Sequence, residues 1–199
     1  MAELIWPLLL FAVVMVVSPG TNNVVATNSG LRFGLRASLP LLAGLGLGVV
    51  SLVLLAALGL GFAVNAVPHA QTALCTAGTV YLLWLAAKIL LSGSPDKTRD
   101  DTQTSQTFTT GLVVSWLNPK VWVLALSAVA GYSAISSDPL ILAAILGGVF
   151  ASIVAPNLVL WCSCGQVIAS RLTTDRRWRI ANTTLAVLLV VSIVLMWLE

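Results

Sequence analysis

The residue in this sequence best placed to do chemistry is a lysine inside an apolar segment. Lys120 lies about ten residues into the stretch GLVVSWLNPKVWVLALSAV, which is otherwise almost wholly apolar. Asn118 and Pro119 come directly before it, so an amide, a helix-disrupting proline and an ammonium group are consecutive. A charged side chain at membrane depth is costly and usually marks a substrate or ion pathway.

A second polar interruption, SPGTNN, lies in the first apolar stretch of the chain. Pro19 lacks an amide hydrogen and Gly20 adds backbone freedom, so both disrupt a helix. The next three side chains, Thr21, Asn22 and Asn23, are polar. Backbone groups freed at such breaks are tolerated in a membrane only where they line a polar cavity. We therefore expect the two interruptions to meet at one site.

The chemistry of that site suits a zwitterion. The half-helix that starts after Gly20 offers free amides and a positive dipole end, which favour a carboxylate. Lys120 offers a charge to the same carboxylate, whereas the carbonyls of the half-helix that ends near Trp116 suit an ammonium group. The predicted substrate-binding residues are Pro19, Gly20, Thr21, Asn22, Asn23, Asn118, Pro119, Lys120 and Asn157.

The composition places these residues in an integral membrane protein. Of 199 residues, 58% are hydrophobic and 9% are charged, whereas a soluble domain carries about 25% charged residues. The apolar runs are long and continuous, which favours helices over a barrel of short alternating strands. We predict an all-α protein with a single transmembrane domain over residues 1–199.

Six spans are predicted. They cover residues 4–27, 39–63, 70–91, 110–131, 139–168 and 180–198. The interruptions fall in the first and fourth spans, which cross the membrane in opposite directions. This is the pattern of a 3+3 inverted repeat with broken helices 1 and 4. The polar residues 92–107 form the predicted flexible cytoplasmic loop between the two halves.

Nine of the ten Lys and Arg residues fall in three alternate connections or, for Lys88, at the end of the span before one, and the exception is Lys120. These nine are Arg32, Arg36, Lys88, Lys97, Arg99, Arg171, Arg176, Arg177 and Arg179. Connections rich in Lys and Arg stay in the cytoplasm, so both termini are predicted to be periplasmic in a multi-pass protein of the inner (plasma) membrane. The first span follows MAE, without a basic region, and is predicted to be retained.

Other functional classes find less support in the sequence. No motif of an enzyme is present, and no cofactor or metal site is predicted. A membrane thiol-disulfide carrier would need cysteines beside the two interruptions, but the three are Cys75, Cys162 and Cys164. The C-x-C pair points to different sides of a helix. That carrier and a non-transporting membrane assembly protein remain the alternatives.

The net charge of +3 needs no nucleic acid to explain it, because basic loops also meet anionic lipid headgroups favourably. His69, the single histidine, falls in a short outer connection. Gly44, Gly46 and Gly48 form a small-residue face that allows close helix packing. We favour packing within one chain, and a homo-oligomer stays an alternative.

The motifs together resemble those of the LysE/RhtB family of amino-acid exporters. The matching segments are PGTNN with GLRFG, TVYLLWLAAKIL, and FTTGLVVSWLNPK. Within the family, the sequence is most similar to the neutral amino-acid branch, which includes cysteine and O-acetylserine exporters. It departs from the family at Thr21, at APNLVLW, where many relatives carry an Asp, and at Asn182.

The resemblance implies efflux of small amino acids or their derivatives, driven by the proton gradient. All seven carboxylate side chains of the chain fall in predicted loops or tails. Lys120 is therefore the candidate proton carrier, and it is expected to pair with the substrate carboxylate.

Single-cysteine labelling tests the predicted orientation. In a chain whose native cysteines have been replaced, Asp138→Cys should react in sealed cells with a membrane-impermeant maleimide, because its connection is periplasmic. Lys97→Cys should react only after the membrane is opened. Labelling of Lys97→Cys in sealed cells would contradict the orientation.

Overall fold

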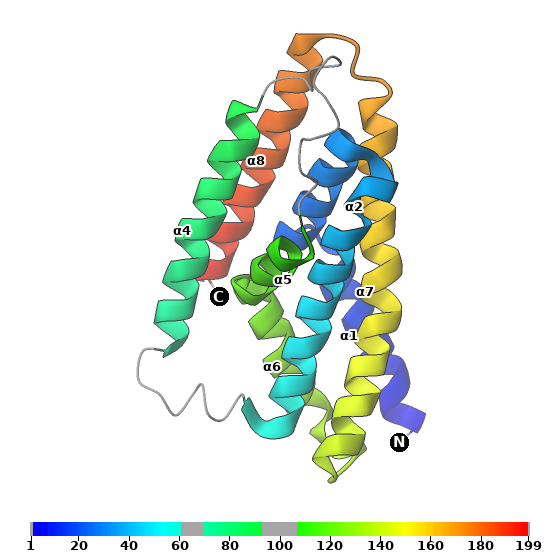
Figure 1. The fold of residues 1–199 in the computed structure, drawn as a ribbon. Helices are drawn as coiled ribbons and strands as arrows, with labels where there is room; N and C mark the ends of the chain where they lie inside the picture. The colour runs from blue at the N-terminus through cyan, green and yellow to red at the C-terminus, as the bar shows by residue number, and fades with distance from the viewer. Residues whose placement is uncertain (1, 61–69, 93–106, 199) are drawn as a thin grey trace.

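A computed structural model describes residues 2–60, 70–92 and 107–198. The described chain is helical, without a strand (Figure 1). Its elements are α1 (Ala2–Val17), α2 (Thr21–Leu55), the π-helix η1 (Ala56–Leu60), α4 (Ala70–Leu91), α5 (Phe108–Trp116), α6 (Pro119–Tyr132), the 3-10 helix η2 (Ser133–Ile135), α7 (Pro139–Ala169) and α8 (Asp175–Leu198). His69, residues 61–63 of the second predicted span and residues 93–106 of the predicted loop lie outside the described residues.

Both predicted interruptions are present. The first separates α1 from α2 at residues 18–20, and the second separates α5 from α6 at residues 117–118. At the second break the chain bends by 65°. Figure 1 shows α1 ending, and α6 beginning, between the two ends of the helical bundle. The proline and glycine chemistry therefore predicted the local breaks correctly.

The long helix α2 reverses direction at Gly34. This residue has φ 74° and ψ 172°, a conformation that essentially only glycine adopts. The hydroxyls of Ser29 and Ser38 are 2.7 Å apart, whereas nine residues of straight helix would span about 13.5 Å. The amide of Leu35 donates to the side chain of Gln166 just after the reversal. Helix α2 is thus two arms, residues 21–33 (the first arm) and residues 35–55 (the second arm).

The number of membrane spans agrees with the prediction only in part. In the part of the chain that the structure describes, three helices are long and apolar enough to cross a membrane, or four if the bent pair α5–α6 forms one span. The break limits α1 to 16 residues, which is shorter than the roughly 20 residues that a continuous spanning helix needs. Several apolar helices confirm the membrane class, and the six-span 3+3 repeat stays a prediction.

Glycines let three helices approach one another closely. A side chain on Gly30 would overlap the backbone of Cys162, and one on Gly165 would overlap the backbone of Thr27, so the first arm and α7 touch through their main chains. Gly44 and Gly111 bring the second arm against α5 in the same way. These contacts support the predicted internal packing of Gly44.

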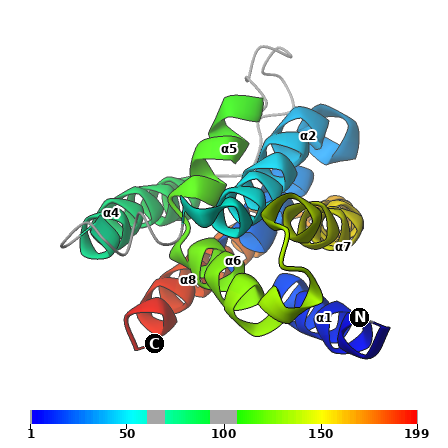
Figure 2. The same ribbon diagram turned by 90° about the horizontal axis from the view of Figure 1, so that it is seen from below.

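Helices α4 and α8 pack against each other beside this group (Figures 1 and 2). The buried amide of Asn182 donates to the carbonyl of Ser92, directly after α4. The turn between the arms of α2, the end of α4 and the α7–α8 connection lie at one end of the bundle (Figure 1). Seven of the described Lys and Arg residues belong to these three segments.

Two glycines of α7 give a matched test of the close packing. Gly165→Ala should destabilise the protein by about 1–3 kcal/mol, because the added methyl forces the first arm away. Gly148→Ala should be neutral or slightly stabilising, because a Cβ atom there meets nothing within 4 Å. Thermal unfolding of the purified proteins in one detergent compares the two. Equal stability of both variants would contradict the close contact.

Candidate functional site

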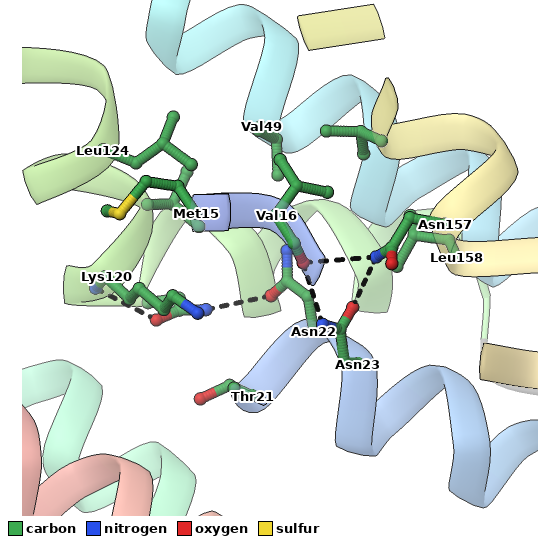
Figure 3. A pocket seen from close by; sticks show the side chains of 14 residues that line it. Met15, Val16, Thr21, Asn22, Asn23, Val49, Lys120, Leu124, Asn157 and Leu158 are labelled. Carbon is green, nitrogen blue, oxygen red and sulfur yellow. Dashed lines mark hydrogen bonds between the residues drawn. The ribbon is translucent and has the colours of Figure 1, made fainter. Parts of the chain in front are cut away.

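A cavity lies where the two helix breaks meet (Figure 3). Its volume is about 40 Å³, and it is partly open to the outside. Side chains of α1, both arms of α2, α6 and α7 surround it. The lining residues are Met15, Val16, Gly20, Thr21, Asn22, Asn23, Val49, Asn118, Lys120, Val121, Leu124, Val154, Asn157 and Leu158.

The end of α1 is held by side-chain donors from two other segments. Its last carbonyls have no partner within the helix, as at every helix C-terminus. The Val16 carbonyl accepts hydrogen bonds from the amides of Asn23 (2.9 Å) and Asn157 (3.3 Å). Asn23 also donates to the Ser18 carbonyl (3.1 Å) and accepts from Asn157 (2.9 Å). Asparagines of the first arm and α7 thus close the first break.

The second break is joined to the first by another pair of asparagines. Asn118 caps α6, accepting from the amide of Lys120 at 3.1 Å. Its own side-chain amide donates to Asn22 at 3.0 Å. Asn22 in turn donates to Ser115 (2.9 Å), whose hydroxyl donates to the carbonyl of Leu45 in the second arm (2.9 Å). One chain of hydrogen bonds therefore connects the first arm, the α5–α6 break and the second arm.

Lys120 reaches from α6 across to the first break. Its Nζ atom donates to the Ser18 hydroxyl (2.7 Å), the Ser18 carbonyl (3.1 Å) and the Pro19 carbonyl (3.4 Å). A Cβ atom on Gly20 would lie 3.1 Å from both Cδ and Nζ of the lysine. A side chain at position 20 would make the lysine shift by a few tenths of an ångström, whereas the extended backbone of Gly20 itself suits any residue.

Two groups of the site keep unused hydrogen-bonding capacity. The N-cap of α2 is Gly20, which has no side chain, so the first amides of α2 receive no side-chain cap. The Oδ1 atom of Asn157 is buried and accepts no hydrogen bond within the described structure. A buried acceptor without a partner is costly, and a donor on a bound ligand would satisfy it.

The rest of the cavity wall is apolar. Seven aliphatic or thioether side chains line it on four elements, and Lys120 is the one charged residue among the described residues of the lining. These seven are Met15, Val16, Val49, Val121, Leu124, Val154 and Leu158. The cavity thus pairs a polar, cationic wall with an apolar one.

Most of the predicted site residues come together here. Seven of the nine line the cavity, and Pro19 and Pro119 do not. Pro19 still contributes its carbonyl to Lys120. Sequence reasoning missed Ser18 and Ser115, although both lie close to a predicted break. The apolar lining carried no signal, because aliphatic residues occur throughout every span.

The structure changes one detail of the expected chemistry. The carbonyl of Trp116 was expected to face a substrate ammonium group, but it accepts from the indole of Trp122 at 2.8 Å. Cys162 is buried and Cys164 is exposed, and neither borders the cavity. In the described ranges, no three His, Cys, Asp or Glu side chains gather as a metal site would require.

Comparison with known proteins finds similarity along most of the chain. The sequence model of the LysE type translocator family matches residues 13–197. Cysteine/O-acetylserine efflux proteins of Escherichia coli O1:K1 and of E. coli strain K12 are 30% and 29% identical over 124 residues. A protein of the same description from Shigella flexneri serotype 5b is 29% identical. In each case the match covers 61% of this chain and 62% of the relative. No solved structure matches the chain.

The two N-caps of α5 and α6 give a test of the hydrogen-bond chain. Asn118→Ala should cost about 2–3 kcal/mol, since it removes a helix cap and leaves the Asn22 carbonyl without a donor. Thr107→Ala removes an exposed cap from α5 and should cost about 1 kcal/mol. Chemical or thermal unfolding in detergent measures the difference. An Asn118 variant as stable as the Thr107 variant would contradict the proposed link between the breaks.

Proposed function

The chain belongs to the LysE type translocator family, and on this basis we propose that it is a secondary transporter that exports small amino acids or their derivatives. The observation that carries the proposal is the cavity at the two helix breaks, with one cation, free helix amides and an unpaired amide oxygen. Such a set of groups matches an α-amino acid and is unrelated to any catalytic constellation. The efflux proteins that the chain resembles support the same substrate class.

The carboxylate of the substrate binds at the start of α2. Backbone amides at a helix N-terminus and its dipole favour an anion. The ammonium of Lys120 lies beside Gly20, the cap of that helix, so it supplies a charge to the same carboxylate. Asn22 and Asn118 orient the lysine and the helix ends through their hydrogen bonds.

The ammonium group of the substrate binds to Asn157. The Oδ1 atom of this residue has no partner in the described structure, and its amide is fixed by Asn23 and Val16. The substrate side chain faces the apolar wall of the cavity. Because the described residues of that wall include no carboxylate and no second cation, a small uncharged side chain is favoured over a charged one.

The 3+3 inverted repeat is part of the proposal. The α1–first arm pair and the α5–α6 pair each break near the middle of the bundle, and α1 and α6 occupy the same half of it in Figure 1. Rocking of one half against the other would expose the cavity to each side of the inner membrane in turn. The basic residues at one end of the bundle support a cytoplasmic location for that end and periplasmic termini.

Protons are the proposed coupling ion. Among the described residues the carboxylate side chains are Glu3, Asp138 and Asp175, and none of them lines the cavity. Lys120 is the titratable group at the site, so the substrate carboxylate pairs with its protonated form. Deprotonation in the other conformation releases the substrate. The departure from relatives that carry an Asp in the fifth span is consistent with this assignment to lysine.

Transport by proteoliposomes tests the function. The wild-type protein should carry small neutral amino acids such as cysteine and O-acetylserine, and a pH gradient should change the rate. Lys120→Met should reduce transport to background, because the substrate carboxylate loses its charge partner. Lys88→Met is the matched control, since Lys88 is exposed and lies over the ring of Trp84, and its rate should stay near that of the wild type.

Two results would contradict the proposal. The first is an absence of flux for every amino acid in a broad panel with correctly reconstituted protein. The second is a Lys120→Met protein that transports at the wild-type rate with the same dependence on pH, which would remove the lysine from coupling.

A further inference from the structure

Three neutral oxygen atoms surround the ammonium group of Lys120. They are the Ser18 hydroxyl and the carbonyls of Ser18 and Pro19, at 2.7, 3.1 and 3.4 Å. The Ser18 hydroxyl donates its own hydrogen to the carbonyl of Met15 at 3.0 Å, so its lone pairs face the ammonium. All three oxygens belong to two consecutive residues, Ser18 and Pro19, at the negative end of α1.

This oxygen set has the chemistry of a site for a monovalent cation. Backbone carbonyls at an unwound helix end are the ligands that membrane transporters use for such ions. These three oxygens are neutral, so the charge that they present is only partial and suits one positive charge. The Ser18 carbonyl also accepts a hydrogen bond from Asn23 at 3.1 Å, whereas Asn157 donates to the Val16 carbonyl and not to this set.

The cation in this site comes from a different helix. Lys120 belongs to the first turn of α6, and its side chain passes over Gly20 to reach the end of α1. Figure 3 shows Lys120 extending along the cavity toward the first break, opposite Asn157. The lysine therefore joins two broken helices that are 102 positions apart in sequence.

We propose that the oxygens of Ser18 and Pro19 form a monovalent-cation site, and that Lys120 fills it with a covalently attached ammonium ion. The side chain takes the place of a dissolved cation, which neutralises the end of α1 and holds the two breaks together. The inference rests on the proposed function only in that this site borders the proposed substrate cavity. A removed lysine should leave an empty site that accepts a small primary ammonium ion.

Chemical rescue tests the site directly. Lys120→Ala deletes Cγ, Cδ, Cε and Nζ, which are the same four heavy atoms as those of n-propylammonium. The variant should melt several degrees below the wild type in detergent. Millimolar propylammonium chloride should restore at least about half of that loss, because a ligand that binds only the folded protein stabilises it. Neither 1-propanol, of the same size but uncharged, nor choline, which is too bulky, should do so.

Two control variants separate charge from volume and from general salt effects. Lys120→Met fills the same space without a charge, so propylammonium should not raise its melting temperature. Lys88→Ala removes an exposed lysine from α4 and should likewise show no response. If Lys120→Ala unfolds during purification, it is purified with propylammonium and the amine is then removed by dialysis. The melting temperature should fall after dialysis.

The proposal is overturned if propylammonium stabilises Lys120→Ala no more than 1-propanol does, or no more than it stabilises Lys88→Ala. The proposal is also overturned if the melting temperature of Lys120→Ala does not change when propylammonium is removed by dialysis. These measurements use no amino-acid substrate. A wild-type protein that transports nothing, combined with intact rescue of Lys120→Ala, would therefore refute the proposed function and leave the cation site standing.

Discussion

The structure depends on how the backbone carbonyls at the end of α1 find hydrogen-bond donors. Hydrocarbon offers none, so a helix that stops inside a membrane protein must be capped by other parts of the chain. Here Asn23, Asn157 and Lys120 supply the donors, from the first arm, α7 and α6. The asparagine side chains are short, and the lysine side chain passes close to the backbone at Gly20. The need to satisfy these carbonyls therefore fixes the relative positions of four helices to within the length of a hydrogen bond.

Close helix packing makes such short donors sufficient. Gly30 and Gly165 let the first arm and α7 touch through their backbones, which brings Asn23 of one within 2.9 Å of Asn157 of the other. Gly44 and Gly111 do the same for the second arm and α5, where Ser115 donates to the carbonyl of Leu45. The small residues and the polar side chains are thus two parts of one arrangement. Without the close approach that the small residues allow, the polar side chains could not reach their hydrogen-bond partners.

The electrostatics of the site follow from the same breaks. A broken helix presents its negative end and the positive start of the next helix a few residues apart. Lys120 occupies the space between them, bound to the end of α1 and adjacent to the start of α2. In the proposed function, this single cation both stabilises the break and attracts the substrate carboxylate. In the proposed transport cycle the substrate and the protein compete for the same ammonium group.

The sequence by itself determined the membrane class, the helical architecture, both breaks and the segregation of basic residues. These properties depend on local composition: proline and glycine act on the backbone where they stand, and hydropathy is a property of each segment. Most of the polar residues of the cavity could be named for the same reason, since they lie within a few positions of Pro19 or Pro119. The hydrogen-bond partners of these residues, however, could not be predicted, because the position of an asparagine within a span does not indicate which group it binds.

Only the tertiary structure decided which groups meet. The bond from Lys120 to Ser18, the pairing of Asn157 with Asn23 and the apolar wall of the cavity join residues far apart in the chain. The reversal at Gly34 is likewise evident only from the contact between the hydroxyls of Ser29 and Ser38. Such contacts depend on the register in which whole helices pack, and that register is set by the summed shapes of many aliphatic side chains that look alike in sequence. The same uniformity that made the membrane class evident is what hid the site's geometry.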